Sequence, residues 1–141
     1  MSQARADTKG PGVAVRARPL SPHMTIWRWH VTMAASIATR ATGVALYVGL
    51  LIVAGWALSL AMGAEAYAGY MGLLASPIGL LVLFGITVSI FYHLAAGLRH
   101  LAFDSGKGFT PATASASAWL CFAFGIVAAL AVFAGGFLIK G

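Results

Sequence analysis

Charged side chains are scarce in this chain of 141 residues, since Asp, Glu, Lys and Arg make up 9% of it. In soluble domains they make up about a quarter. Apolar residue types account for 60%, and the mean hydropathy is +0.89. This composition excludes a water-soluble monomer. The nine Lys and Arg outnumber the three Asp and Glu, but so little polar surface leaves no room for a nucleic-acid footprint. We therefore expect a lipid bilayer as partner and no nucleic acid.

Cysteine is nearly absent, because Cys121 is the only one in the sequence. The chain cannot form an internal disulfide, and it cannot supply the thiolates of an iron–sulfur cluster or a Cys-rich zinc site. The sequence also lacks a Gly-rich dinucleotide-binding fingerprint. Any redox chemistry here has to use another type of ligand or another chain.

Long uncharged runs are what the sequence has instead. Three stretches contain no Asp, Glu, Lys or Arg, namely residues 41–64, 66–98 and 108–139. About 20 apolar residues cross a hydrocarbon core of about 30 Å as a helix, and the runs lack the alternation of barrel strands. The sequence therefore predicts an all-α fold, a three-helix transmembrane bundle. We place the spans near residues 36–62, 77–103 and 114–139.

Local signals support these boundaries. Ser76 followed by Pro77 is typical of a capped helix start, and Thr110 with Pro111 repeats that pattern just ahead of the third span. Gly63 and Gly106 follow the first two spans, where helices commonly end.

The basic residues predict the orientation in the membrane. Six of the nine lie before or at the start of the first span: Arg5, Lys9, Arg16, Arg18, Arg28 and Arg40. Arg99 and Lys107 flank the loop after the second span. By the positive-inside rule, the N-terminus and this second loop are cytoplasmic, whereas the first loop and the C-terminus are periplasmic. We interpret residues 1–17 as a short flexible cytoplasmic tail and residues 18–141 as the membrane anchor domain, in a bacterial cytoplasmic (inner) membrane.

An ionisable residue inside a membrane span is costly and is therefore a functional candidate. His93 is such a residue, and His100 lies seven positions later on the same helix face, with Gly97 between them. His93 can be a haem ligand or a histidine that hydrogen-bonds a neighbouring helix. The two histidines are about 10 Å apart along the helix axis, so they cannot be the axial pair of one haem. His100 can meet a haem propionate or simply face interfacial water.

A second candidate site lies at the start of the first span. Ser36 and Arg40 are four residues apart and Gly43 follows, so one helix face offers a hydroxyl, a guanidinium and a gap. These groups can bind a quinone carbonyl and stabilise the charge that develops on its oxygen. The alternative is that Arg40 only sets topology by reaching to the membrane interface.

Two sequence motifs resemble those of a known family. One comprises Arg18-Pro19-Leu20-Ser21-Pro22-His23, Ser36 and Arg40-Ala41-Thr42-Gly43, and the other runs from His93 to Gly106. Together they resemble the cytochrome b membrane-anchor subunit of succinate dehydrogenase, respiratory complex II. The resemblance implies a subunit that shares haem b and a ubiquinone-reduction site with its partners and oxidises no succinate alone. FAD and iron–sulfur clusters would lie in a flavoprotein subunit and an iron–sulfur subunit.

The resemblance also implies residue roles. His93 would be one axial ligand of haem b, and a second small membrane-anchor subunit would supply the other. Ser36 and Arg40 would belong to the quinone pocket, and Arg40 and His100 would lie near the haem propionates. One position departs from the family, which usually has histidine where this chain has Thr39. A threonine cannot supply a cationic donor to a propionate.

Three alternatives stay open at this point. The chain can be a haem-free structural anchor, or the anchor of a quinol:fumarate reductase. It can also be a small transporter or channel subunit with His93 as a proton relay, although three spans are too few for inverted repeats.

Overall fold

The computed structural model describes residues 26–140, and within that range it contains four α-helices and no strand. They are α1 (Val31–Ala61), α2 (Ala64–Ala75), α3 (Pro77–Asp104) and α4 (Pro111–Lys140). The tail predicted for residues 1–17, and the first part of the N-terminal motif, lie outside the described residues.

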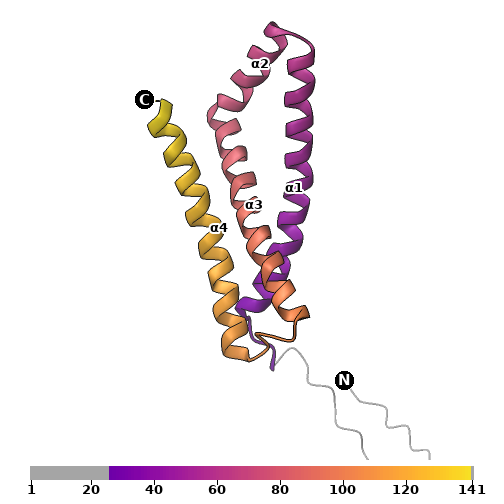
Figure 1. Cartoon of the computed structure of the whole chain (residues 1–141), viewed down its shortest axis with the longest axis vertical. Coiled ribbons are helices and arrows are strands. Elements are labelled where there is room, and N and C mark those ends of the chain that lie inside the picture. Colours follow the sequence, from indigo (N-terminus) through magenta and orange to yellow (C-terminus); the bar gives the residue numbers. More distant parts are fainter. Residues whose placement is uncertain (1–25, 141) are drawn as a thin grey trace, which may run out of the picture.

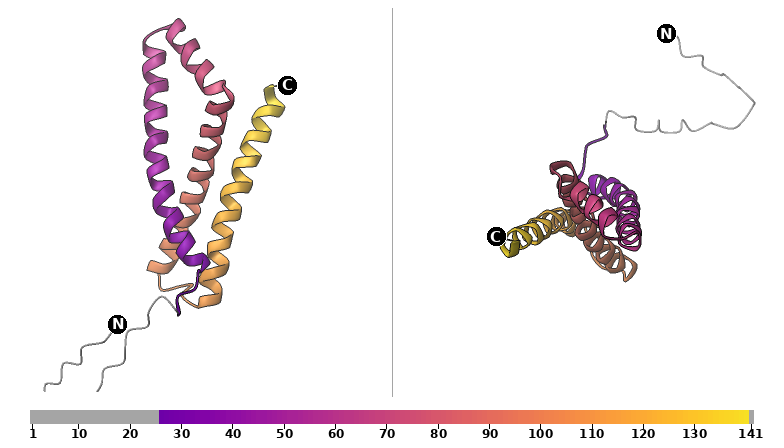
Figure 2. Two further views of the ribbon diagram at one scale, coloured as in Figure 1. Left: turned by 180° about the vertical axis from the view of Figure 1, so that it is seen from behind. Right: turned by 90° about the horizontal axis from the view of Figure 1, so that it is seen from above.

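The predicted three-helix transmembrane bundle is confirmed. Helices α1, α3 and α4 are each long and apolar enough to cross a membrane. The start of α1, the end of α3 and the start of α4 lie at one end of the bundle, and α3 packs against both other long helices (Figures 1 and 2). The predicted candidate residues on α1 and α3 therefore lie on adjacent helices.

Capping groups determine where the long helices begin. Helix α1 starts at Val31 rather than Ser36, because the His30 ring accepts a hydrogen bond from the Thr32 amide. The Ser76 hydroxyl caps α3 by accepting from the Gly79 amide at 3.1 Å. Helix α4 starts at Pro111 rather than residue 114, and the Thr110 hydroxyl accepts from the third amide of that helix at 3.3 Å.

Glycine is required after two of the helices. Gly63 follows the last turn of α1 with φ 106°, and Gly106 follows α3 with φ 76°. These left-handed backbone conformations are strained for residues that carry a Cβ atom. The chain thus ends both helices at the positions that the glycines predict.

The connection between the first two spans differs from the prediction, which treated it as a loop. Residues 64–75 form the separate helix α2. Glu65 in its first turn complements the positive end of the helix dipole, and the Tyr70 hydroxyl ties it to α1 by donating to the Ile52 carbonyl at 2.8 Å. Pro77 ends α2 because the residue before a proline avoids helical geometry, and Ser76 is extended with ψ 158°.

The protein core lies between α1, α3 and α4. Tyr92 of α3 is 2% exposed, and its hydroxyl donates to the Ala35 carbonyl of α1 at 2.9 Å. It packs with Ala96 and Cys121. On the α4 side, a Cβ atom added to Gly125 would lie 3.0 Å from the Tyr92 Cβ and 3.2 Å from its backbone nitrogen. The absence of a side chain at Gly125 thus lets α4 approach the α3 backbone closely.

Replacing Gly125 with leucine is expected to force α3 and α4 apart, because the new side chain meets backbone that cannot rotate away. Overpacking of this kind costs about 1–3 kcal/mol, so the detergent-solubilised protein should melt at a lower temperature. Gly135→Leu is the matched control on the same helix, since nothing lies within 4 Å of a Cβ atom there. Equal destabilisation by both variants would contradict a specific helix contact at Gly125.

Candidate functional site

His93 faces α1 from the middle of the bundle. The side chain is half-buried on α3, and its Nδ1 atom lies 3.0 Å from the Thr42 Oγ1 atom. A Cβ atom added to Gly43 would lie 3.5 Å from the His93 Cε1 atom, so the ring edge packs against the glycine. The structure thus joins one residue of the second motif to two residues of the first.

The partners of Thr42 favour one direction for this hydrogen bond. The Thr42 hydroxyl donates to the Ala38 carbonyl at 2.8 Å, and the Thr39 carbonyl lies at 3.1 Å. A hydroxyl has one hydrogen, and this one is used within the helix. With the Thr42 hydroxyl donating within the helix, the matching partner is the His93 tautomer that carries its proton on Nδ1 and donates to Thr42. In that tautomer the Nε2 atom carries the lone pair.

A lone pair on Nε2 is what an axial histidine offers to haem iron. Space on the same face of α3 fits a flat macrocycle, because Gly97 has no atom within 4 Å of an added Cβ and is exposed. Across residues 26–140, no three His, Cys, Asp or Glu side chains gather as a metal site. His93 therefore fits a metal-containing group that needs only one ligand from this chain.

The other interpretation of His93, as a histidine that hydrogen-bonds a neighbouring helix, matches the contact with Thr42 directly. That contact uses only Nδ1. Because imidazole has two nitrogen atoms with separate roles, the helix link and a ligand role are compatible in this geometry.

Ser36 and Arg40 lie together, as their four-residue spacing predicts. Both side chains are exposed, and they line one shallow depression at the start of α1 with Thr32, Met33 and Ile37. In the part of the chain that the structure describes, neither side chain makes a hydrogen bond that an added ligand would have to replace. Arg40 precedes Thr42 by two residues, about 200° around the helix, so the two side chains leave α1 on different faces.

His100 and Thr39 have different surroundings. His100 is exposed near the end of α3, with its ring centroid 6.3 Å from that of Phe103. The Thr39 hydroxyl donates to the Ala35 carbonyl at 2.8 Å, the same oxygen that receives the Tyr92 hydroxyl. Thr39 thus takes part in the α1–α3 contact, whereas His100 presents its ring to the surroundings.

Two residues of this site were missed from the sequence. Thr42 was noted only as part of a motif, and Tyr92 was not noted at all. Each bonds a group more than 50 positions away, as the separations of 51 and 57 residues show. The one sequence feature that could have pointed to them is their position beside candidate site residues, since Tyr92 precedes His93 and Thr42 follows Arg40 closely.

Comparisons with known proteins identify relatives. The model of the family described as "Succinate dehydrogenase/Fumarate reductase transmembrane subunit" matches residues 15–132. The chain is 38% identical to the succinate dehydrogenase cytochrome b556 subunit of Paracoccus denitrificans over 91 residues, 64% of this chain and 70% of that one. It is 34% identical to the corresponding b556 subunit of Rickettsia conorii over 102 residues, 72% of this chain and 79% of that one.

A mitochondrial relative matches over a smaller share of its length. The chain is 42% identical to the mitochondrial succinate dehydrogenase cytochrome b560 subunit of Sus scrofa over 95 residues. These residues are 66% of this chain and 56% of the pig subunit, so the match spans little more than half of that relative.

Proposed function

The chain belongs to the family of succinate dehydrogenase/fumarate reductase transmembrane subunits, and from this membership we propose that it is the cytochrome b membrane anchor of a succinate:ubiquinone oxidoreductase. Residues 18–141 form its anchor domain in a bacterial cytoplasmic membrane, with the start of α1 and the α3–α4 loop on the cytoplasmic side. The excess of basic residues at that end supports this orientation. A second small anchor subunit, an iron–sulfur subunit and a flavoprotein subunit complete the complex.

One observation carries the proposed haem site, the hydrogen bond between His93 Nδ1 and Thr42 Oγ1. With Nδ1 as the donor, this contact leaves the Nε2 lone pair free to bind iron, and it fixes the ring against α1. Haem b supplies a one-electron redox centre within the membrane. His93 would supply one ligand to the haem iron, the second anchor subunit would supply another, and His100 and Arg40 would lie toward the propionates.

The depression at Ser36 and Arg40 is the proposed contribution to the quinone site. The Ser36 hydroxyl donates to one carbonyl of ubiquinone, and the Arg40 guanidinium stabilises the negative charge that develops on the quinone oxygen during reduction. Both groups lie at the end of α1 that carries the basic residues. Electrons from clusters in a soluble partner would therefore reach the quinone near the membrane surface.

A tagged chain tests this assignment. Purification from membranes should recover the other three subunits and a succinate-dependent reduction of ubiquinone that follows the tag. Recovery of the chain with other proteins, and without succinate dehydrogenase activity, would contradict the assignment. Fumarate reduction that exceeds succinate oxidation with the same preparation would indicate the reverse physiological direction.

A haem-free structural anchor is the second candidate, because the His93–Thr42 contact also serves as a link between α1 and α3. In that case His93 and Thr42 contribute only to stability. Interhelical hydrogen bonds in membranes contribute about 0.6 kcal/mol on average, so loss of the contact would change little else.

Thr42→Val is expected to raise the haem reduction potential. The variant keeps the β-branched shape of threonine but removes the acceptor for the Nδ1 proton, so the imidazole donates less electron density and the oxidised iron is less stabilised. A hydrogen bond of about 1 kcal/mol corresponds to at most about 40 mV for one electron. Redox titration of the b-type band measures the shift. Thr42→Ser keeps the hydroxyl and should have the same reduction potential as the wild type. An unchanged potential in Thr42→Val would contradict the proposal that Thr42 positions His93.

A further inference from the structure

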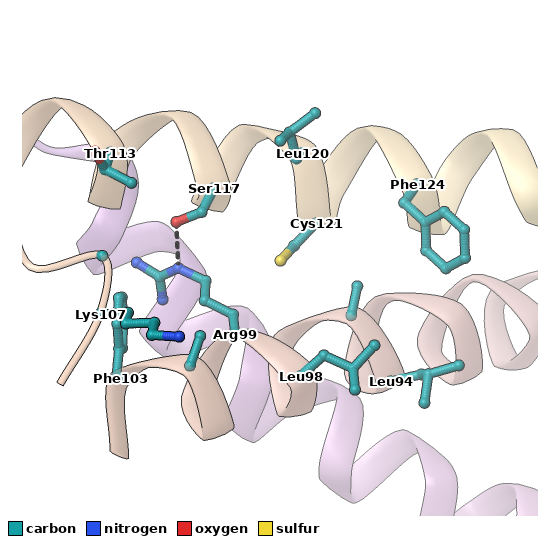
Figure 3. A pocket seen from close by; sticks show the side chains of 13 residues that line it. Leu94, Leu98, Arg99, Phe103, Lys107, Thr113, Ser117, Leu120, Cys121 and Phe124 are labelled. Atoms are coloured by element: carbon teal, nitrogen blue, oxygen red, sulfur yellow. Dashed lines mark hydrogen bonds between the residues drawn. The ribbon is translucent and has the colours of Figure 1, made fainter. Parts of the chain in front are cut away.

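A groove runs between α3 and α4 at the end of the bundle where the two helices are joined. Its volume is about 570 Å³, within the range of about 300–1,000 Å³ that is typical of small-molecule sites. Arg99, Lys107, Thr113 and Ser117 surround one end of it (Figure 3). Along its length the walls are apolar, with Leu94, Leu98, Leu120 and Phe124 among the lining side chains.

The length of the groove corresponds to one membrane leaflet. On α4 it extends from Thr113 to Phe124, which is about 17 Å at 1.5 Å per residue. The hydrocarbon core is about 30 Å thick, so each leaflet contributes about half of that. A spanning helix of a partner would need the whole thickness, whereas one acyl chain needs a single leaflet. The dimensions therefore favour a lipid as the occupant.

The polar end of the groove carries two positive charges. The Arg99 side chain is held in place, since its Nε atom donates to the Ser117 hydroxyl at 2.9 Å and its Nη2 atom donates to the Ala114 carbonyl at 3.1 Å. The guanidinium also lies 4.4 Å from the centroid of the Phe103 ring. All three partners are uncharged, so they orient the guanidinium without neutralising it.

No carboxylate balances these charges within residues 26–140. The acidic residues in that range are Glu65, in the helix α2 at the other end of the bundle, and Asp104. Asp104 is exposed and lies beyond 4 Å from both the Arg99 and the Lys107 nitrogens. Two cations beside an apolar groove at membrane-interface depth are complementary to a phosphate with an attached acyl chain.

We propose that this groove binds one anionic phospholipid of the leaflet that the α3–α4 loop faces. The lipid phosphate lies against the Lys107 ammonium and the Arg99 guanidinium, and one acyl chain lies between α3 and α4. The lipid would bridge the two helices at the end where the loop joins them, and this proposal does not depend on the haem or quinone assignments.

The test measures lipids retained by the detergent-solubilised complex, loaded from vesicles of phosphatidylglycerol or of phosphatidylcholine with the same acyl chains. Native mass spectrometry should detect one phosphatidylglycerol that survives washing, in preference to phosphatidylcholine. Lys107→Gln should weaken its retention about fivefold, as expected for one cation near a lipid headgroup. Arg28→Gln is the matched control, because Arg28 is exposed near the start of α1 and does not line the groove.

Ala102→Phe tests the apolar part separately. The larger side chain occupies the groove while both cations remain, so it should reduce retention of phosphatidylglycerol without changing the charge. Equal retention of both lipids, or an equal loss in Arg28→Gln and Lys107→Gln, would overturn the proposal in favour of diffuse surface charge. A Leu98→Cys variant that cross-links to another subunit would assign the groove to a partner protein and would overturn it too.

Discussion

Replacing His93 with alanine is expected to remove haem b from the assembled complex. The methyl group has no lone pair, and the iron would keep one protein ligand, from the second anchor subunit, where the native site has two. Haem per complex, measured as the pyridine haemochrome, should fall from stoichiometric to almost none. Succinate oxidation with a soluble dye should persist, because that reaction uses the flavoprotein and the clusters of the partner subunits.

His100→Ala is the matched control for this variant. It removes an imidazole from the same helix seven residues away, but from an exposed position with no hydrogen bond among the described residues. It should therefore retain haem, with at most a change in potential from the altered propionate environment. Full haem content in His93→Ala would contradict the ligand role and leave the Thr42 contact as a structural link.

The second large effect is expected at Arg40. In Arg40→Ala the developing charge on the quinone oxygen loses its cationic donor, so ubiquinone reduction should fall by roughly 10²-fold. Haem content should be unchanged, because Arg40 supplies no ligand to the iron in the proposed site. Steady-state assays with ubiquinone and with a soluble dye, on the same preparation, separate this effect from a defect in assembly.

Arg40→Lys distinguishes chemistry from topology. A lysine keeps the positive charge and can reach the membrane interface equally well, but it lacks the planar fork of donors. If Arg40 acts on the quinone, the lysine variant should insert normally and still be slow with ubiquinone. Normal ubiquinone reduction in Arg40→Ala would show that the arginine only sets the orientation of α1.

The three spans could be predicted from the sequence because their signals are local. Long runs without charge determine α1, α3 and α4, and Ser76, Gly63 and Gly106 mark boundaries through capping and backbone geometry. Helix α2 could not be predicted in the same way. It is a 12-residue apolar segment next to longer ones, and its connection to α1 depends on a hydrogen bond from Tyr70.

In the candidate site, too, the contacts within one helix could be predicted and the contacts between helices could not. Ser36 and Arg40 meet because both lie on one helix, where a spacing of four residues determines which side chains are neighbours. The pairing of His93 with Thr42 depends instead on how far α1 and α3 are rotated about their axes. That rotation follows from tertiary contacts such as Tyr92 with the Ala35 carbonyl, which no local pattern reveals.

The most direct test of the proposed function is the visible spectrum of the purified complex, reduced with succinate and compared with its oxidised form. If His93 ligates a haem on the path of electrons from succinate, a b-type α-band should appear with succinate and reach its full height with dithionite. An assembled complex that shows no such band with either reductant would contradict the cytochrome assignment and identify the chain as a haem-free anchor.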